Sequence, residues 1–266
     1  MSRARQTPAQ PEEIYARARE EGRRRLARPV LELAATALVG GFDVAFGVIA
    51  FALAAGAVGA SSSSELAHLA GALAFGTGFV FVVVGKSELF TENFLVPIAG
   101  LDRRSRASWL KLGELWVGTL LLNLAGGAAV AIIATGEGVL PGRSHAELVR
   151  LSERLTGHGA LTAFVSAVVA GALMTLMTWF VEGAAESMGV RILMSWIVGT
   201  LIALGTFNHA VVSTIEIVFG MRYGASSTLT DLFSNLGLAV AGNLVGGLVL
   251  VTFARSAQAF AASRPS

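Results

Sequence analysis

A short polar segment between two apolar stretches constrains the fold of this chain more than any other feature. The segment runs from Gly85 to Asn93, with an apolar run over 69–84 before it and a shorter one over 94–99 after it. Each of its three charges would cost roughly 2.5–3.5 kcal/mol at membrane depth. The backbone must therefore line a cavity or be packed inside protein. The pattern predicts a transmembrane helix that is broken near the membrane midplane, as in helices that build membrane binding sites.

Long apolar runs with few charges recur along the whole chain. Only 14% of the 266 residues are charged, whereas soluble domains carry roughly 25%. Four runs are long enough, at about 20 residues, to cross a bilayer unbroken. Two more are too long for one plain span and contain a polar interruption. These runs are 33–58, 115–134, 160–179 and 232–254, with interruptions in 69–100 and 192–219. We therefore expect an all-α membrane protein with six transmembrane helices, of which the second and fifth are broken.

The distribution of Lys and Arg predicts the orientation. If the N-terminus faces the cytoplasm, the inner segments carry fifteen of these residues and the outer segments four, while Lys86 lies in the break. By the positive-inside rule both termini are cytoplasmic. The first thirty residues hold eight Arg and no apolar core, so we expect no secretory signal. The chain is predicted to be a multi-pass protein of the bacterial inner (plasma) membrane, without a nucleic-acid partner.

Three regions are expected along the chain. Residues 1–30 form a cytoplasmic N-terminal segment with a short amphipathic helix over 12–28, residues 31–256 form the six-span channel domain, and residues 257–266 form a cytoplasmic tail. The arginines of the N-terminal helix either contact anionic membrane lipid, at about 1 kcal/mol per charge, or serve only as a topology signal.

A repeated motif divides the spans into two halves. Asn123-Leu-Ala-Gly-Gly recurs as Asn243-Leu-Val-Gly-Gly, 120 residues later, and Thr91 and His209 in the two breaks are 118 residues apart. Each half holds three spans, and because three is odd the second half enters the membrane in the opposite orientation. The sequence thus predicts an inverted repeat, which is typical of transporters and channels.

The second break, over 205–213, contains the residue on which we place most weight. Asn208 is a candidate N-cap for the second half-helix, and Thr91 or Ser87 for the first. Half-helix N-termini that converge in the membrane favour an anion. His209 is the only ionisable residue in the centre of this break. Because histidine exchanges protons near neutral pH and intramembrane ionisable groups are usually functional, we expect His209 to act in transport.

Other polar residues are assigned more modest roles. Asp43, near the middle of the first span, should face the protein interior and form a structural hydrogen bond. The chain has no cysteine, and the two histidines of the 135–159 connection lack further ligands. Neither a metal site nor a cofactor is expected.

At the two breaks the sequence resembles the formate/nitrite transporter family. Three motifs carry the resemblance, and their order and spacing agree over about residues 30–255: Ser87-Glu88-Leu89-Phe90-Thr91, Phe207-Asn208-His209-Ala210-Val211 and Gly242-Asn243-Leu244-Val245-Gly246-Gly247. The resemblance implies homopentamers of aquaporin-like protomers, each with its own pore for small monovalent anions. It places Thr91 and His209 at the pore centre and makes Phe75, Leu89 and Ile202 candidates for apolar constrictions.

The chain also departs from the family pattern, which suggests a side branch. Ser213 stands where an asparagine is typical, Glu216 where an apolar residue is usual, and Lys86 is unusual before the Ser-Glu-Leu-Phe-Thr motif. A charge beside a break is costly without a partner. We therefore expect polar partners or water for Lys86 and Glu216, with Glu88 or Glu92 as candidates for Lys86.

The resulting expectation is a channel for small monovalent anions, passive or coupled to a proton through His209. Formate, nitrite and hydrosulfide-like weak acids are the expected cargo. The main alternative is an aquaporin-type pore for small neutral solutes. A membrane enzyme is not expected, because no nucleophile–base pair, metalloprotease motif or phosphate loop occurs. A scaffold or sensor that uses residues 1–30 is the remaining alternative.

Overall fold

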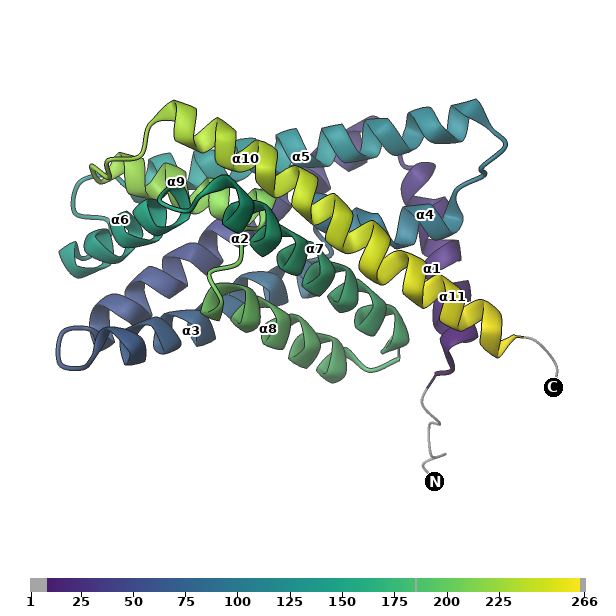
Figure 1. Ribbon diagram of the computed structural model, residues 1–266, viewed down its shortest axis with the longest axis horizontal. Coiled ribbons are helices and arrows are strands. Elements are labelled where there is room, and N and C mark those ends of the chain that lie inside the picture. The colour runs from purple at the N-terminus through teal and green to yellow at the C-terminus, as the bar shows by residue number, and fades with distance from the viewer. Residues whose placement is uncertain (1–8, 185, 264–266) are drawn as a thin grey trace, which may run out of the picture.

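The structure is a computed structural model that describes residues 9–184 and 186–263, and within these ranges every regular element is helical (Figure 1). The elements are α1 (Pro11–Leu26), α2 (Val30–Val58), α3 (Ser64–Gly85), the 3₁₀ helix η1 (Phe90–Phe94), α4 (Val96–Gly100), α5 (Arg106–Ala134), α6 (Gly142–Thr156), α7 (Ala160–Gly183), α8 (Met188–Leu204), α9 (Ala210–Arg222), α10 (Leu229–Leu244), the π-helical stretch η2 (Val245–Thr252) and α11 (Phe253–Ala262).

Five of the described helices are long and apolar enough to cross a membrane. They are α2, α3, α5, α7 and the continuous helix over Leu229–Ala262, whereas the apolar α8 has 17 residues. The helix α3 has 22 residues and extends further toward the N-terminus than the apolar run over 69–84 that the sequence showed. The helix begins at Ser64, because the Ser63 hydroxyl accepts a hydrogen bond from the Leu66 N–H at 3.3 Å and caps it.

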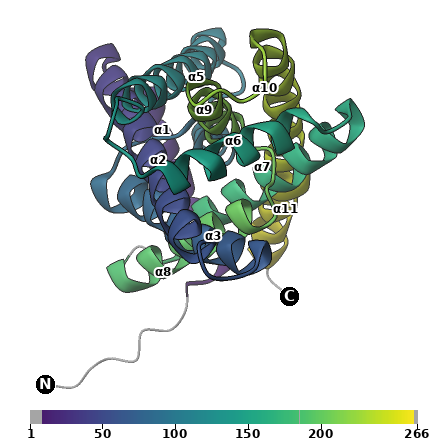
Figure 2. The ribbon, with the colours of Figure 1, turned by 90° about the vertical axis from the view of Figure 1, so that its left-hand side faces the viewer.

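Small residues let the long helices pack with their backbones close together. A Cβ added to Gly41 of α2 would lie 2.1 Å from the Asn123 carbonyl oxygen of α5. In the second half, a Cβ on Gly246 would lie 1.9 Å from the Val168 carbonyl oxygen of α7. Such glycines permit close helix contact in membranes. Viewed from the end that carries α6, the α2/α5 pair and the α7/α10 pair lie on different sides of the bundle (Figure 2).

The helices α3 and α8, which lead into the two breaks, run antiparallel. His68 near the start of α3 contacts the Leu204 carbonyl oxygen at the end of α8, at 3.0 Å. Further along, the Trp196 indole N–H donates to the Leu73 carbonyl oxygen at 2.9 Å. The two breaks therefore approach from opposite directions.

The N-terminal helix α1 packs closely on the protein. Ala18 is fully buried, and a Cβ on Gly22 would lie 2.0 Å from the Val96 carbonyl oxygen of α4. Its Tyr15 ring lies 5.4 Å from the Phe260 ring of α11, so the first and last helices meet at one end of the bundle (Figure 1).

An amphipathic helix occupies the connection over 135–159, where the sequence analysis expected no element. This is α6, at the opposite end of the bundle from α1 (Figure 1). Leu148, Leu151 and Leu155 lie on one face of α6 and are buried. Their three- and four-residue spacing is the helical signal that the analysis did not use.

Candidate functional site

The two helix breaks begin in the same way. After α3, Lys86 takes a left-handed conformation (φ 56°) and the Ser87 N–H donates to the Val82 carbonyl oxygen at 3.2 Å. After α8, Thr206 is left-handed (φ 49°) and the Phe207 N–H donates to the Ile202 carbonyl oxygen at 3.0 Å. Both ends are Schellman-type caps. Left-handed backbone is strained for residues other than glycine, most of all for β-branched ones.

Two buried asparagines form hydrogen bonds with backbone groups that the breaks leave without helical partners. In the first half, the Asn123 amide donates to the carbonyl oxygens of Ala37 (2.7 Å) and Glu88 (2.9 Å), and its Oδ1 accepts from the Phe90 N–H at 2.9 Å. Unpaired backbone groups are not tolerated at membrane depth. Asn123 thus ties α2, α5 and the first break together.

Asn243 repeats this arrangement in the second half. Its amide donates to the carbonyl oxygens of Ala167 (2.8 Å) and Asn208 (3.0 Å), and its Oδ1 accepts from the Ala210 N–H at 2.9 Å. The break residues that correspond are therefore 120 residues apart, as are the asparagines themselves. Thr91 and His209, at 118, are not counterparts: the counterpart of His209 is Leu89.

Thr91 and His209 instead contact each other where the two breaks meet. Both side chains are fully buried, and Thr91 Oγ1 lies 2.7 Å from His209 Nε2. The Val212 N–H donates to His209 Nδ1 at 3.1 Å, so the neutral imidazole carries its proton on Nε2 and donates it to Thr91. Ser213 holds the histidine backbone, because its Oγ accepts from the His209 N–H at 3.0 Å. The Thr91 hydroxyl proton remains available to another acceptor.

The predicted helix caps are wrong in both breaks. His209 itself is the N-cap of α9 through its Nδ1. Asn208 exchanges two hydrogen bonds with Asn235, at 2.9 and 3.0 Å. In the first break neither Thr91 nor Ser87 caps η1; the Leu89 N–H donates to the Glu92 carboxylate at 3.0 Å.

The hydroxyl of Ser87 has another partner. It donates to Asp43 Oδ2 at 2.6 Å, which gives Asp43 the structural hydrogen bond that the sequence predicted.

Apolar side chains surround the Thr91–His209 pair. The predicted residues Phe75, Leu89 and Ile202 are all buried. Phe79 was not predicted from the sequence, yet its ring centroid lies 6.0 Å from that of His209 and 5.5 Å from that of Phe75. Phe79 comes four residues after Phe75 in α3, so the shared helix face was a usable signal.

A buried ion cluster joins the N-terminal helix to the first break. Glu88 is 2% exposed, and its carboxylate accepts hydrogen bonds from Arg25 at 3.4 Å and from Arg28. Arg25 also donates to Asn93 Oδ1 at 2.9 Å. The predicted pairing of Lys86 with Glu88 or Glu92 is therefore wrong. No local pattern indicates these partners, because sixty or more residues separate each arginine from Glu88.

Lys86 faces a cavity instead. This cavity has a volume of about 530 Å³ and lies beside the first break. Its other charged lining residues are the cations Arg24, Arg25, Arg28 and Arg191 and the carboxylates Glu21, Glu32, Glu88, Glu92 and Glu182. Lys86 is exposed, and within the described residues no carboxylate lies within ion-pair distance of it. Near the second break, Arg154 donates to Thr206 Oγ1 at 3.3 Å.

Glu216 lies on α9, seven residues after His209 and therefore on the same helix face. Its side chain is 5% exposed. In residues 9–184 and 186–263 no hydrogen bond or ion pair to its carboxylate is formed, so of the expected alternatives, a polar partner or water, the described part of the chain supplies no protein partner.

These features together define a class of protein. Long apolar helices, two interrupted helices with satisfied backbones, and a buried hydroxyl–imidazole pair are what a multi-pass membrane channel or transporter needs. The chain belongs to the formate/nitrite transporter family, whose sequence model matches residues 12–257. That family consists of channels and transporters, in agreement with the expectation that the chain is not an enzyme.

Individual relatives are similar over most of the chain. The inner membrane protein YfdC of Escherichia coli is 25% identical over 259 residues, covering 94% of this chain and 79% of the relative. A probable formate transporter of Methanothermobacter thermautotrophicus is 28% identical over 242 residues, covering 84% and 87%. The solved structure of a pentameric formate channel with formate bound has the same fold, with a TM-score of 0.72 at 20% identity, covering 86% of this chain and 96% of that one.

Proposed function

We propose that this protein is a channel for small monovalent anions such as formate and nitrite, with its pore centre at Thr91 and His209. One observation carries the proposal: a hydroxyl and an imidazole, both fully buried, lie 2.7 Å apart where the two helix breaks meet. The relatives whose names include formate support the choice of cargo.

The proposed path leads from a cavity lined by charged residues to a region of buried apolar side chains. Anions enter through the cavity beside the first break, whose lining holds as many carboxylates as cations, and Lys86 provides a positive charge there without a carboxylate partner among the described residues. The buried apolar side chains of Leu89, Phe75 and Ile202 then strip water from the anion. Desolvation raises the pKa of a weak acid, so formate, nitrite and hydrosulfide become easier to protonate there.

Thr91 is the residue we assign to direct contact with the anion. Its hydroxyl oxygen accepts the Nε2 proton of His209, which leaves the hydroxyl hydrogen to donate to the cargo. His209 orients and polarises this hydroxyl. For His209 to pass a proton to the cargo, Nδ1 must first take one up, and the hydrogen bond from Val212 must break. Proton coupling through His209 is therefore the secondary hypothesis.

The wider architecture is part of the same proposal. We infer six crossings in two inverted halves, supported by the antiparallel α3 and α8 and by the repeated asparagine contacts. A homopentamer with one pore per protomer is supported by the pentameric formate channel of the same fold. Cytoplasmic termini in a bacterial inner membrane are supported by the excess of Lys and Arg at that end.

Flux measurements in proteoliposomes test the proposal. The wild-type protein should carry formate and nitrite between pH 5 and 8, an interval chosen around the ordinary pKa of histidine, about 6.5. His209→Phe should abolish this flux. His209→Asn keeps an N-cap oxygen and a donor, so it should retain part of the flux. His158→Asn, on an exposed histidine, is the matched control and should behave as wild type.

The outcomes separate the alternatives. A flat pH profile in His209→Asn alone would favour proton coupling through the histidine. Flux of glycerol or urea without flux of anions would contradict the proposal in favour of a neutral-solute pore. Anion flux that is indifferent to both His209 variants would remove the histidine from the mechanism.

A further inference from the structure

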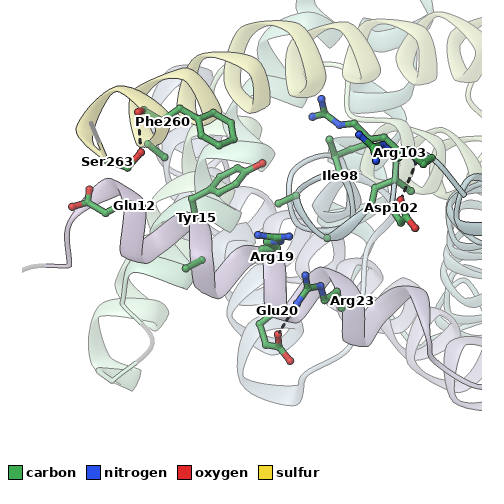
Figure 3. Close-up of a pocket in the computed structure, with 16 residues that line it drawn as sticks. Glu12, Tyr15, Arg19, Glu20, Arg23, Ile98, Asp102, Arg103, Phe260 and Ser263 are labelled. Atoms are coloured by element: carbon green, nitrogen blue, oxygen red, sulfur yellow. Dashed lines mark hydrogen bonds and ion pairs between the residues drawn. The ribbon is translucent and has the colours of Figure 1, made fainter. Parts of the chain in front are cut away.

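A second cavity lies at the end of the bundle where α1 and α11 meet, away from the pore centre. Its volume is about 770 Å³ (Figure 3). Arg19 and Arg23 of α1 contribute one part of its lining, and Arg103 and Arg104, from the turn between α4 and α5, contribute another. Four arginines from two separate segments thus converge on one space that no step of the proposed transport path uses.

The acidic residues around this cavity leave most of these arginines unneutralised. Arg23 pairs with Glu20 at 3.7 Å. Asp102 Oδ1 accepts the backbone N–H of Arg104 at 3.1 Å. Over the described ranges, no carboxylate lies within 4.0 Å of the side-chain nitrogens of Arg19, Arg103 or Arg104.

The third carboxylate, Glu12, lies away from the arginine turn. Figure 3 places it beside Ser263, at the opposite end of the cavity from Arg103. The cavity therefore has an arginine-rich end in which a negative charge is favoured.

The surroundings of the cavity place it at the membrane–water boundary. The Tyr15 ring packs on the Phe260 ring at 5.4 Å, and Phe260 is 58% exposed at the end of the last membrane helix. The half-exposed Trp109 donates its indole N–H to the Arg103 carbonyl oxygen at 3.2 Å and so holds the arginine-bearing turn. Tyr and Trp are enriched at this depth because their side chains combine an apolar ring with a polar group that reaches the headgroup region.

Part of the cavity lining is apolar. Ile98, Ala99, Ala259 and Phe260 contribute to it. Figure 3 shows Ile98 beside Arg103, and Phe260 beside Tyr15. A ligand that fits needs a phosphate or similar anion and an adjoining hydrocarbon part, because the cations and the apolar residues line one cavity. A small soluble anion would use only the charged part of this lining.

We propose that this cavity binds the headgroup of an anionic phospholipid, with the phosphate on Arg103, Arg104 and Arg19. Arginine suits a phosphate because its planar guanidinium donates two parallel hydrogen bonds. The glycerol and first methylenes of the lipid lie against Ile98 and Phe260. The bound lipid joins α1 to α11 and to the turn that precedes α5. This inference stands independently of the proposed transport function.

Native mass spectrometry of the full-length protein in mild detergent tests the proposal. The wild type is titrated with phosphatidylglycerol and, separately, with phosphatidylcholine of the same acyl chains. We expect retention of phosphatidylglycerol. Arg103→Gln/Arg104→Gln should weaken its binding about 20- to 30-fold, because each arginine near anionic lipid contributes about fivefold. Arg106→Gln, on the exposed start of α5 outside the cavity, is the matched control and should change binding less than twofold.

Each other outcome overturns the proposal in a defined way. Equal retention of phosphatidylcholine would show that charge is not recognised. An equal loss of phosphatidylglycerol binding in Arg106→Gln would show that the lipid is attracted by the overall positive charge of this surface and not by a defined site. Binding of soluble glycerol 3-phosphate as tight as that of the lipid would make the ligand a cytosolic phosphate ester. Unchanged anion flux and thermal melting in the double variant verify that it is folded.

Discussion

Replacing Glu88 with glutamine should loosen the N-terminal helix from the first helix break. In the protein, the carboxylate of this residue is 2% exposed and accepts from both Arg25 and Arg28. A hydrogen bond to a charged group contributes about 1.5–3 kcal/mol and a neutral one about 0.5–1.5 kcal/mol. Glutamine keeps one acceptor oxygen, so one bond is lost and the other, whose arginine donor is still charged, is weakened. The expected loss is about 2–4 kcal/mol.

Two neighbouring carboxylates set an upper limit on this loss of stability. Arg25 and Arg28 keep other carboxylates nearby, since Glu21 lies 3.1 Å from Arg25 and Glu32 lies 3.2 Å from Arg28. Glu88→Gln therefore leaves neither guanidinium isolated, and the cost should not exceed the roughly 3–5 kcal/mol of a buried ion pair that loses one partner.

Thermal melting of the purified protein in mild detergent measures the effect. At about 2–4 °C per kcal/mol for a chain of this size, the melting temperature should fall by about 4–16 °C. Glu114→Gln is the control, because its ion pair with Lys111 at 2.8 Å is half exposed on α5 and should contribute less than about 1 kcal/mol.

A double-mutant cycle isolates the ion pair itself. Glu88→Gln combined with Arg28→Gln should cost less than the sum of the two single changes, with a coupling of about 1–3 kcal/mol. If Glu88→Gln melts as the wild type does, or if the two changes are additive, the ion cluster does not hold α1, and the apolar contacts of α1 with α4 are sufficient.

Three further predictions use the same melting assay. Asn123→Ala and Asn243→Ala each leave one backbone N–H and two carbonyls unpaired. Each should therefore lower the free energy of unfolding by at least about 3 kcal/mol. Clearly unequal losses would contradict the correspondence of the two breaks. Gly171→Ala should prevent stable folding because its Cβ would lie 2.2 Å from the Asn243 carbonyl oxygen, whereas Gly113→Ala, with nothing within 4 Å, should melt as the wild type does. Burial opposes ionisation of Glu21, but hydrogen bonds from Arg24 and the charge of Arg25 outweigh it and lower the pKa of Glu21. The ionised carboxylate therefore stabilises the fold above its ordinary pKa of 4.5, and this stabilisation is lost on acidification. Glu21→Gln should reduce the fall in melting temperature below about pH 4.5, and an unchanged fall would contradict the prediction.

Several properties of this protein were determined by the sequence alone. The charge-poor runs, the two breaks and the choice of His209 as a candidate site residue follow from local patterns, whereas Thr91 became a candidate through the family resemblance. In a membrane these patterns are unusually informative, because a helix satisfies its own backbone groups within one segment. A polar interruption in an apolar run is therefore visible without any knowledge of its partners. Even here the start of α3 at Ser64 required the capping hydrogen bond to Ser63.

Only the tertiary structure decided which groups meet at the breaks. Asn123 and Asn243 were visible as a repeat, but their hydrogen bonds to Glu88 and Asn208 depend on how α5 and α10 lie against the breaks. Phe79, on the same helix face as Phe75, was identified only by its distance from His209.

The assignment of partners to charges depended on tertiary structure most of all. Glu88 had a nearby cation in Lys86, yet it pairs with Arg25 and Arg28. The physical reason is that Lys86 ends α3 in a left-handed conformation and is exposed at the cavity, while α1 packs on α4 and carries its arginines to the buried carboxylate. Sequence spacing determines where a charge lies along the chain, but its counter-ion is determined by the packing of segments that lie sixty or more residues apart.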